Sequence, residues 1–125
     1  MKTKIIAMYL PQYHETEDNN RWWGQGFTDW TSVKTSEPLF EGHRQPRVPQ
    51  NANYYDLSEV ENIKWQAKLA KKYGVYGFGI YHYWFSTEKQ TLTKPAELLL
   101  EHKEIDMPFF FGWDNNSWVR TWSKY

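Results

Sequence analysis

The sequence lacks several features that would otherwise assign a protein class. It has no cysteine, which excludes disulfides, thiolate nucleophiles and zinc–thiolate sites and is typical of a reducing compartment. Its 15 basic and 15 acidic residues cancel, so no electrostatic surface for nucleic acid is expected. No apolar run has the length of a membrane span, and the run near the amino terminus is too short for a secretory signal. We therefore expect a cytoplasmic protein without a nucleic-acid partner or membrane insertion.

The motifs of metal and nucleotide sites are also missing. No two histidines share a metal-ligand spacing, and no phosphate-binding P-loop occurs. Gly24 and Gly26 begin like a dinucleotide-binding loop, but Asp29 stands where that motif needs its third glycine. There is no Asp-x-Asp pair of the kind that holds a divalent ion in many nucleotide-sugar transferases. The sequence therefore predicts neither a metal nor a cofactor.

Aromatic residues are abundant instead. Trp, Tyr and Phe number 24, against 18 for Ile, Leu and Val together. They gather with polar residues in four blocks, at 5–14, 22–30, 81–85 and 113–118. Large flat rings beside fixed polar groups suit the faces and hydroxyls of a sugar. Composition alone leaves open the alternative that these rings form an aromatic-rich core.

The order of predicted elements indicates a parallel α/β fold. Buried strands are expected at Lys4–Met8, Val75–Trp84 and Met107–Trp113, and helices at about 57–73 and Pro95–His102. A β-α-β-α-β order is typical of neighbouring parallel strands joined by right-handed crossovers, with the helices packed outside. Residues 10–55, rich in Pro, Gly, Asn and Gln, are predicted to form one long loop after the first strand.

In a (β/α)₈ barrel the carboxyl ends of the strands and the following loops line the active site. Because the aromatic blocks fall at those places, we expect their residues to converge on a carbohydrate; packing at the barrel rim is the ordinary alternative. The candidate substrate-binding residues are Tyr9, Gln12, His14, Trp23, Trp30, Tyr81, His82, Trp84, Trp113 and Asn115.

Two carboxylates stand among these aromatic residues, and they are the candidate catalytic groups. Asp29 lies between Phe27 and Trp30, where burial would raise its pKa, and Asp114 follows Trp113. The ordinary role for Asp29 is to accept hydrogen bonds that brace its loop. His14 and His82 are either hydrogen-bond donors to sugar hydroxyls or structural residues.

In order and spacing, the four blocks closely resemble the start of the WbsX-like family of polysaccharide-biosynthesis proteins. Members are usually described as glycosyltransferases and are related to the glycoside hydrolase family 99 endo-mannosidase barrels. The resemblance implies the N-terminal β-α-β-α-β portion of a glycosidase-like (β/α)₈ TIM barrel. The family usually has Glu in place of Asp29, and it commonly has Trp-Ala-Asn-Glu where this chain has Trp113-Asp114-Asn115-Asn116. The acid of that second motif has therefore either moved or been lost in this chain.

The resemblance also implies that residues 1–125 form a single partial domain, since family members continue beyond this point. The third strand would then expose a Phe triplet, followed by an aromatic loop at 118–125. We expect a fragment of an enzyme that makes or cleaves glycosidic bonds in lipopolysaccharide or O-antigen, supplying an aromatic substrate-binding wall and inactive alone. The alternatives are a non-catalytic carbohydrate-binding module and an inactive truncated remnant. The sequence does not indicate which sugar or linkage is recognised, or whether the reaction is hydrolysis or transfer.

Overall fold

The computed structural model describes residues 3–116, and every statement below refers to that part of the chain. Its strands are β1 (Ile5–Tyr9), β2 (Val75–Trp84), β3 (Gln90–Thr91) and β4 (Phe109–Trp113). Its helices are α1 (Glu17–Trp23), α2 (Asp29–Thr35), the 3₁₀ turn η1 (Gln50–Ala52), α3 (Val60–Lys72) and α4 (Lys94–Glu101). The aromatic loop expected at 118–125 lies outside the described residues.

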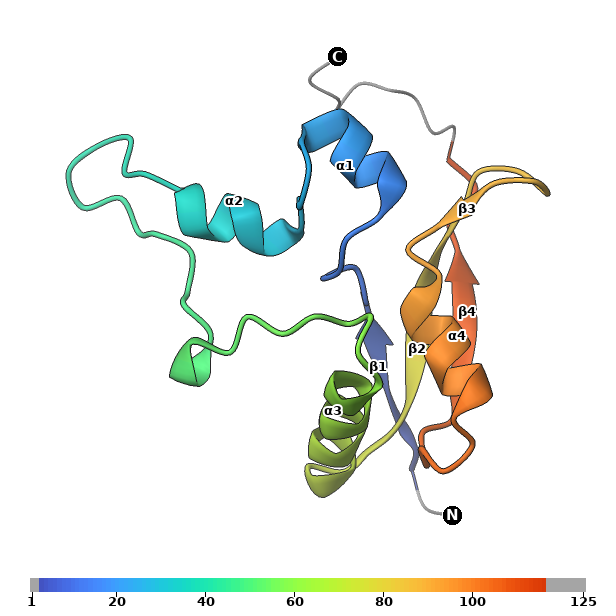
Figure 1. Ribbon diagram of the computed structural model, residues 1–125. Helices are drawn as coiled ribbons and strands as arrows, with labels where there is room; N and C mark the ends of the chain where they lie inside the picture. Colours follow the sequence, from blue (N-terminus) through green and yellow to red (C-terminus); the bar gives the residue numbers. More distant parts are fainter. Residues whose placement is uncertain (1–2, 117–125) are drawn as a thin grey trace.

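The sheet is built around β2, which pairs in parallel with β1 on one side and with β4 on the other. The register places Met8 beside Gly79 and Gly79 beside Phe110. The expected order of three neighbouring parallel strands is therefore confirmed, with α3 and α4 as the crossovers (Figure 1). The short β3 returns antiparallel along the carboxyl end of β2, an addition that the sequence did not indicate.

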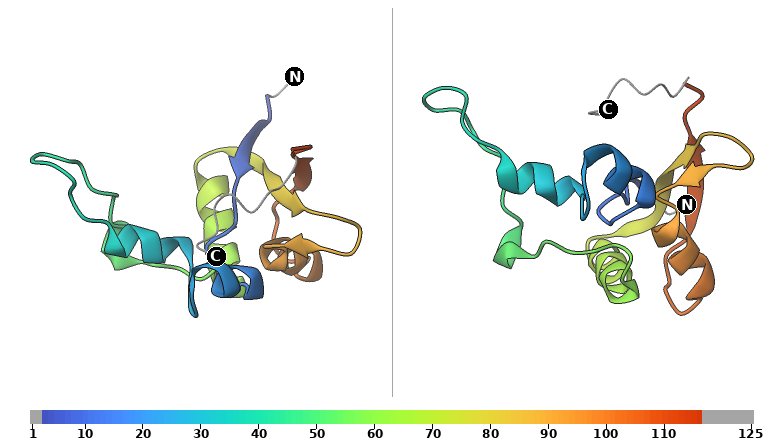
Figure 2. Two further views of the ribbon diagram at one scale, coloured as in Figure 1. Left: turned by 90° about the horizontal axis from the view of Figure 1, so that it is seen from above. Right: turned by 45° about the horizontal axis from the view of Figure 1, so that its top comes forward.

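Both crossover helices cover the same face of the sheet, as the view from above shows (Figure 2). Phe78 and Ile80 project from β2 toward them because alternate residues of a strand point to the same face. Burying one such aliphatic or aromatic side chain stabilises the fold by roughly 1.5–3 kcal/mol. The buried hydrophobic core consists of Leu57, Ile63, Ala67, Phe78, Ile80, Ala96, Leu98, Leu99 and Met107.

The other face of the sheet is apolar and uncovered. The Met8 side chain is 73% exposed and that of Phe110 is 51% exposed. Between them run the buried glycines of β2, where a strand neighbour comes very close. A Cβ on Gly77 would stand 2.4 Å from the backbone carbonyl oxygen of Pro108, and one on Gly79 would stand 2.9 Å from the Phe110 ring. Glycine at these two positions therefore lets the neighbouring chain approach β2 closely.

The segment expected as one long loop contains α1, α2 and η1. Helices α1 and α2 lie beyond the carboxyl end of β1, whereas η1 lies to the side, level with that strand (Figure 1). Thr16 caps α1, its Oγ1 accepting a hydrogen bond from the backbone N–H of Asn19 at 3.1 Å. At the start of α2 the backbone N–H of Thr28 donates to Oγ1 of Thr31 at 3.3 Å. Neither helix buries a residue fully, so neither produces the apolar stripe that sequence periodicity detects.

Candidate functional site

A chain of polar side chains connects the carboxyl ends of the strands. Gln12, just after β1, donates from Nε2 to Oδ1 of Asp29 at 2.8 Å. The hydroxyl of Tyr83 in β2 donates to Oε1 of the same glutamine, also at 2.8 Å. Because the two ends of the Gln12 amide have different partners, its orientation is fixed. The end of β1, the end of β2 and the start of α2 are thereby tied together.

The chain continues to the end of β4. The Tyr81 ring lies beside that of Tyr83, with centroids 4.9 Å apart, and its hydroxyl donates to Oδ2 of Asp114 at 2.8 Å. The side-chain amide of Asn116 donates to both carboxylate oxygens of Asp114, at 2.6 and 2.8 Å. We call this set the strand-end polar network; its members are Asp29, Gln12, Tyr83, Tyr81, Asp114 and Asn116.

The two carboxyl groups of the network have pKa values displaced in opposite directions. Partial burial raises the pKa of Asp29, opposed by the Gln12 hydrogen bond, the Asp29 backbone N–H and the nearby His14. Hydrogen bonds from Tyr81 and Asn116 lower the pKa of Asp114. Burial and the bond to Asp114 raise the pKa of Tyr81 to about 12. At neutral pH Asp114 is therefore ionised and Tyr81 keeps its proton.

Three of the expected substrate-binding residues are engaged in packing that supports the network. The Tyr9 ring stacks on Phe78, with centroids 4.3 Å apart, and its hydroxyl donates to Gln66 of α3. The Trp30 ring packs among tyrosines, and its indole N–H donates to the carbonyl of Tyr55 at 2.9 Å. His14 is only 3% exposed, with Nδ1 3.0 Å from the carbonyl oxygen of Glu15 and Nε2 buried without a partner. Trp30 holds α2, and hence Asp29, against the body of the protein.

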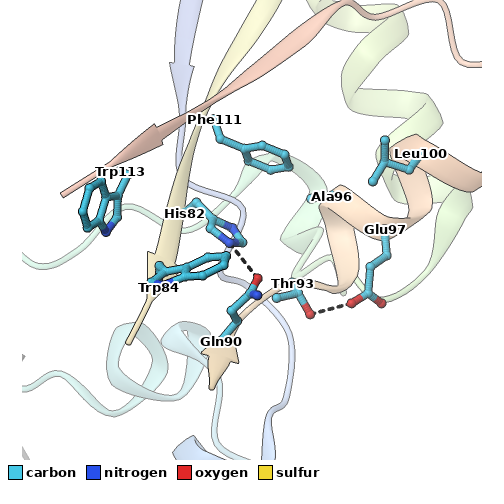
Figure 3. A pocket seen from close by; sticks show the side chains of 9 residues that line it. All are labelled: His82, Trp84, Gln90, Thr93, Ala96, Glu97, Leu100, Phe111 and Trp113. Carbon is cyan, nitrogen blue, oxygen red and sulfur yellow. Dashed lines mark hydrogen bonds between the residues drawn. The ribbon is translucent and has the colours of Figure 1, made fainter. Parts of the chain in front are cut away.

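On the helix-covered face, a cavity of about 700 Å³ opens between β2, β4 and α4 (Figure 3). Nε2 of His82 lies 2.8 Å from Oε1 of Gln90, and the hydroxyl of Thr93 donates to the Glu97 carboxylate at 2.7 Å. The cavity is mainly apolar, and its aromatic rings are partly exposed. Its lining residues are His82, Trp84, Gln90, Thr93, Ala96, Glu97, Leu100, Phe111 and Trp113.

The structure thus divides the sequence candidates between two faces, because successive residues of a strand point in opposite directions. In β2, Tyr81 joins the polar network, whereas His82 and Trp84 line the cavity. In and after β4, Trp113 lines the cavity and Asp114 joins the network. The expectation that all of them converge on one concave end treated each block as a unit and neglected this alternation.

Two candidates are not members of the network, and two of its members were missed. Trp23 is partly exposed at the end of α1, its ring stacked 5.7 Å from Phe27, and Asn115 is exposed beside Asp114. Tyr83 and Asn116 were not among the sequence candidates. A period of two along β2 would have identified Tyr83, which shares a face with Tyr81; no sequence signal singled out Asn116.

Within residues 3–116, no three His, Asp or Glu side chains gather closely enough to hold a metal ion. Over the same residues, no helix combines the length and apolar character needed to cross a bilayer. What the geometry offers is a fixed array of hydroxyl, amide and carboxylate groups, with aromatic rings on both sides of the sheet.

This parallel α/β sheet with a polar carboxyl end belongs to a protein of the Glycosyltransferase WbsX family, whose model matches residues 5–125. Two relatives come from Xanthomonas campestris pv. campestris, strains B100 and ATCC 33913, and each is described as uncharacterized protein WxcX. Both are 42% identical over 118 residues, which is 94% of this chain but 17% of the relative. The chain therefore spans about a sixth of the length of these relatives. No solved structure matches it.

Proposed function

We propose that this chain forms the substrate-binding wall of a glycan-active enzyme in cell-surface polysaccharide biosynthesis, of the lipopolysaccharide or O-antigen type. Membership in a family named for glycosyltransferases supports the reaction class. The observation that carries the proposal is the strand-end polar network, which fixes hydroxyl, amide and carboxylate groups at the carboxyl ends of three parallel strands. Alternating donors and acceptors of this kind match the hydroxyls of a sugar ring.

We further propose that residues 1–125 are the N-terminal β-α-β-α-β portion of a (β/α)₈ barrel. The parallel strand order and the placement of α3 and α4 on one face agree with that plan. Barrel interiors are filled by layers of inward side chains, a role suited to the exposed Met8 and Phe110.

In this proposal the residues have different roles. Gln12, Tyr81 and Asn115 contact the sugar from the network side, and Trp23 offers an exposed ring at the end of α1. Tyr9, His14 and Trp30 hold these groups in place through the contacts described above. The cavity residues His82, Trp84 and Trp113 present a second aromatic surface at the same end of the sheet.

We propose that the catalytic groups lie in a part of the complete enzyme outside residues 1–125. Glycoside chemistry uses two carboxyl groups placed on either side of the scissile bond. Asp114 is already held by Tyr81 and Asn116, and Asp29 by Gln12, so both carboxylates brace the network. The chain alone should therefore bind sugar without converting it.

The test is a titration followed by two-dimensional ¹H–¹⁵N NMR, using methyl glycosides of glucose, galactose and mannose. The side-chain amide of Gln12 gives its own signal, and we expect it to shift together with backbone signals of 81–83 and 114–116. Gln12→Ala should abolish the shifts. Gln45→Ala is the matched control, since Gln45 is exposed and donates only to the carbonyl of His43. Failure of all three glycosides to move any of these signals would contradict the proposed function.

A further inference from the structure

We infer that the strand-end polar network is a subsite for an uncharged sugar and discriminates against uronic acids and nucleotide-activated sugars. This inference rests on the proposed function and narrows its substrate class. It follows from the distribution of charge along the network: a carboxylate stands at each end, Asp29 from α2 and Asp114 after β4. The groups between them, Gln12, Tyr83 and Tyr81, are neutral at physiological pH.

Within the described part of the chain neither carboxylate forms an ion pair, although the nearby His14 lowers the pKa of Asp29. The ion pairs found there use Glu61, Glu104, Asp106 and Asp18 as their acidic partners. Asp29 and Asp114 are held instead by uncharged amide and hydroxyl donors. These donors satisfy the hydrogen bonding of both carboxyl groups without neutralising a negative charge. Asp114 carries that charge at neutral pH, and Asp29 carries it once the pH is above its raised pKa.

One lysine, Lys89, lies near this end of the sheet, but its ammonium group already pairs with a carboxylate of the protein. Lys89, in the turn between β2 and β3, lies with Nζ 2.8 Å from Oδ1 of Asp18 in α1. The same ammonium stands 5.8 Å from the centre of the Trp22 ring. Asp18 is well shielded, with 19% of its side chain exposed, so this pair fixes α1 against the turn. Because Asp18 already compensates the charge of Lys89, the attraction of this lysine for a phosphate or carboxylate on a ligand is weakened.

The two classes of ligand therefore meet opposite conditions. A neutral hydroxyl can donate to a carboxylate and accept from an amide N–H, and charge-assisted bonds of this type are the stronger ones. An anionic group entering between Asp29 and Asp114 meets two like charges, and partial burial of Asp29 reduces the screening of that repulsion by salt. A discrimination of roughly tenfold corresponds to about 1.4 kcal/mol, which a single like charge a few ångströms away supplies near a protein surface.

The experiment compares matched ligands that differ in charge. Dissociation constants of the protein are measured by NMR titration for methyl glucoside, galactoside and mannoside, for the three corresponding uronates, and for UDP-glucose against UDP. We expect each neutral glycoside that binds to bind at least about tenfold more tightly than its uronate. The sugar of UDP-glucose should add no affinity over UDP, and the double variant Asp29→Asn/Asp114→Asn should bring the neutral-to-uronate ratio close to one.

Asp106→Asn is the control, because that exposed carboxylate pairs with Lys71 near the opposite end of the sheet and should leave the ratio unchanged. Uronates that bind as tightly as their neutral partners would overturn this inference while leaving the proposed function intact. A ratio that persists in the double variant would also overturn it. If no neutral or acidic sugar binds, the proposed function itself fails.

Discussion

The hydroxyl of Tyr83 donates a hydrogen bond to Oε1 of Gln12, 2.8 Å away, although the two residues are 71 positions apart in the chain. This bond joins the carboxyl ends of β1 and β2 above the last paired residues of the two strands. It also orients the glutamine so that its Nε2 faces Asp29. The Tyr83 hydroxyl thereby helps to position, through Gln12, the carboxylate of Asp29 at the start of α2.

Tyr83→Phe should destabilise the protein by about 1 kcal/mol, because the partly buried Oε1 of Gln12 loses its donor. Tyr76→Phe is the matched control: Tyr76 lies in the same strand, and its hydroxyl accepts only an exposed hydrogen bond from Lys4. That change should cost less than about 0.5 kcal/mol. Urea unfolding followed by tryptophan fluorescence measures both values, and equal stabilities for the two variants would contradict the role given to the Tyr83–Gln12 bond.

Gly77→Ala should destabilise strongly and Gly79→Ala mildly, although the two glycines share one face of β2. A Cβ at position 77 would meet the carbonyl oxygen of Pro108 at 2.4 Å, and that oxygen accepts a ladder hydrogen bond from Phe78 and cannot move freely. At position 79 the near atoms belong to the exposed side chains of Phe110 and Met8, which can rotate away. We expect a loss of about 3 kcal/mol or unfolding for the first, and about 1 kcal/mol or less for the second. The same urea experiment tests this, and a reversed order would refute the account of the sheet.

The parallel sheet could be predicted from the sequence because its strands are apolar runs and α3 between them carries an apolar stripe of helical period. The apolar stripe containing Ile63 and Ala67 predicted α3, and both residues are buried where it packs on the sheet. Helices α1 and α2 could not be predicted in this way. They have seven residues each and are held by caps at Thr16 and Thr28 and by contacts to distant segments, such as that of Trp30 with Tyr55.

The sequence predicted which blocks of residues lie at the candidate site better than it predicted which face of the sheet each side chain points to. The blocks containing Gln12 and Tyr81 do lie at the carboxyl ends of adjacent strands. Which residue of a block faces the network depends on strand phase, and phase is fixed by the register between β2 and its neighbours. That His82 and Tyr81 point to opposite faces follows from the period of two along a strand, which an interpretation of each block as one unit overlooked. Which of the two faces carries the network depends on the register, and the sequence alone does not supply that register.

Asp29→Asn and Asp114→Asn should change the pH dependence of stability in opposite directions. The pKa of Asp29 lies above its ordinary value of 3.8 in the folded protein, so its contribution is present in acid and is lost as pH rises through the raised pKa. Asp29→Asn should therefore match the parent in acid and become the more stable protein toward neutral pH. The pKa of Asp114 is lowered from 3.8, so its contribution is present above about pH 4 and is lost as pH falls.

Asp114→Asn should accordingly be less stable than the parent at neutral pH, with the difference closing in acid. Free energies of unfolding measured in urea at a series of pH values between acid and neutral test both statements. Asp106→Asn serves as the control, since Asp106 is exposed and lies outside the network. Parallel curves for the Asp29 and Asp114 variants would contradict the opposite environments that the structure gives these two carboxyl groups.

Residues 1–125 alone should not hydrolyse or transfer any glycoside at a rate above that of buffer. Displacement at an anomeric carbon needs two carboxyl groups roughly 5 to 9.5 Å apart on either side of the bond. The glutamates of α3 and α4 lie on the helix side of the sheet, where Glu61 pairs with Lys64 and Glu97 accepts from Thr93. They cannot reach a sugar bound on the opposite face.

Asp29 and Asp114 are on the correct face, but each is committed to donors of the network. A misplacement of about 1 Å in such groups can cost a hundredfold in rate. The assay uses aryl glycosides of glucose, galactose and mannose, with and without a nucleotide-sugar donor, and a glycosidase of known activity as the positive control. Turnover that disappears in both Asp29→Asn and Asp114→Asn, but survives in Asp106→Asn, would make those two residues the catalytic pair. The proposal that catalysis lies outside residues 1–125 would then be wrong.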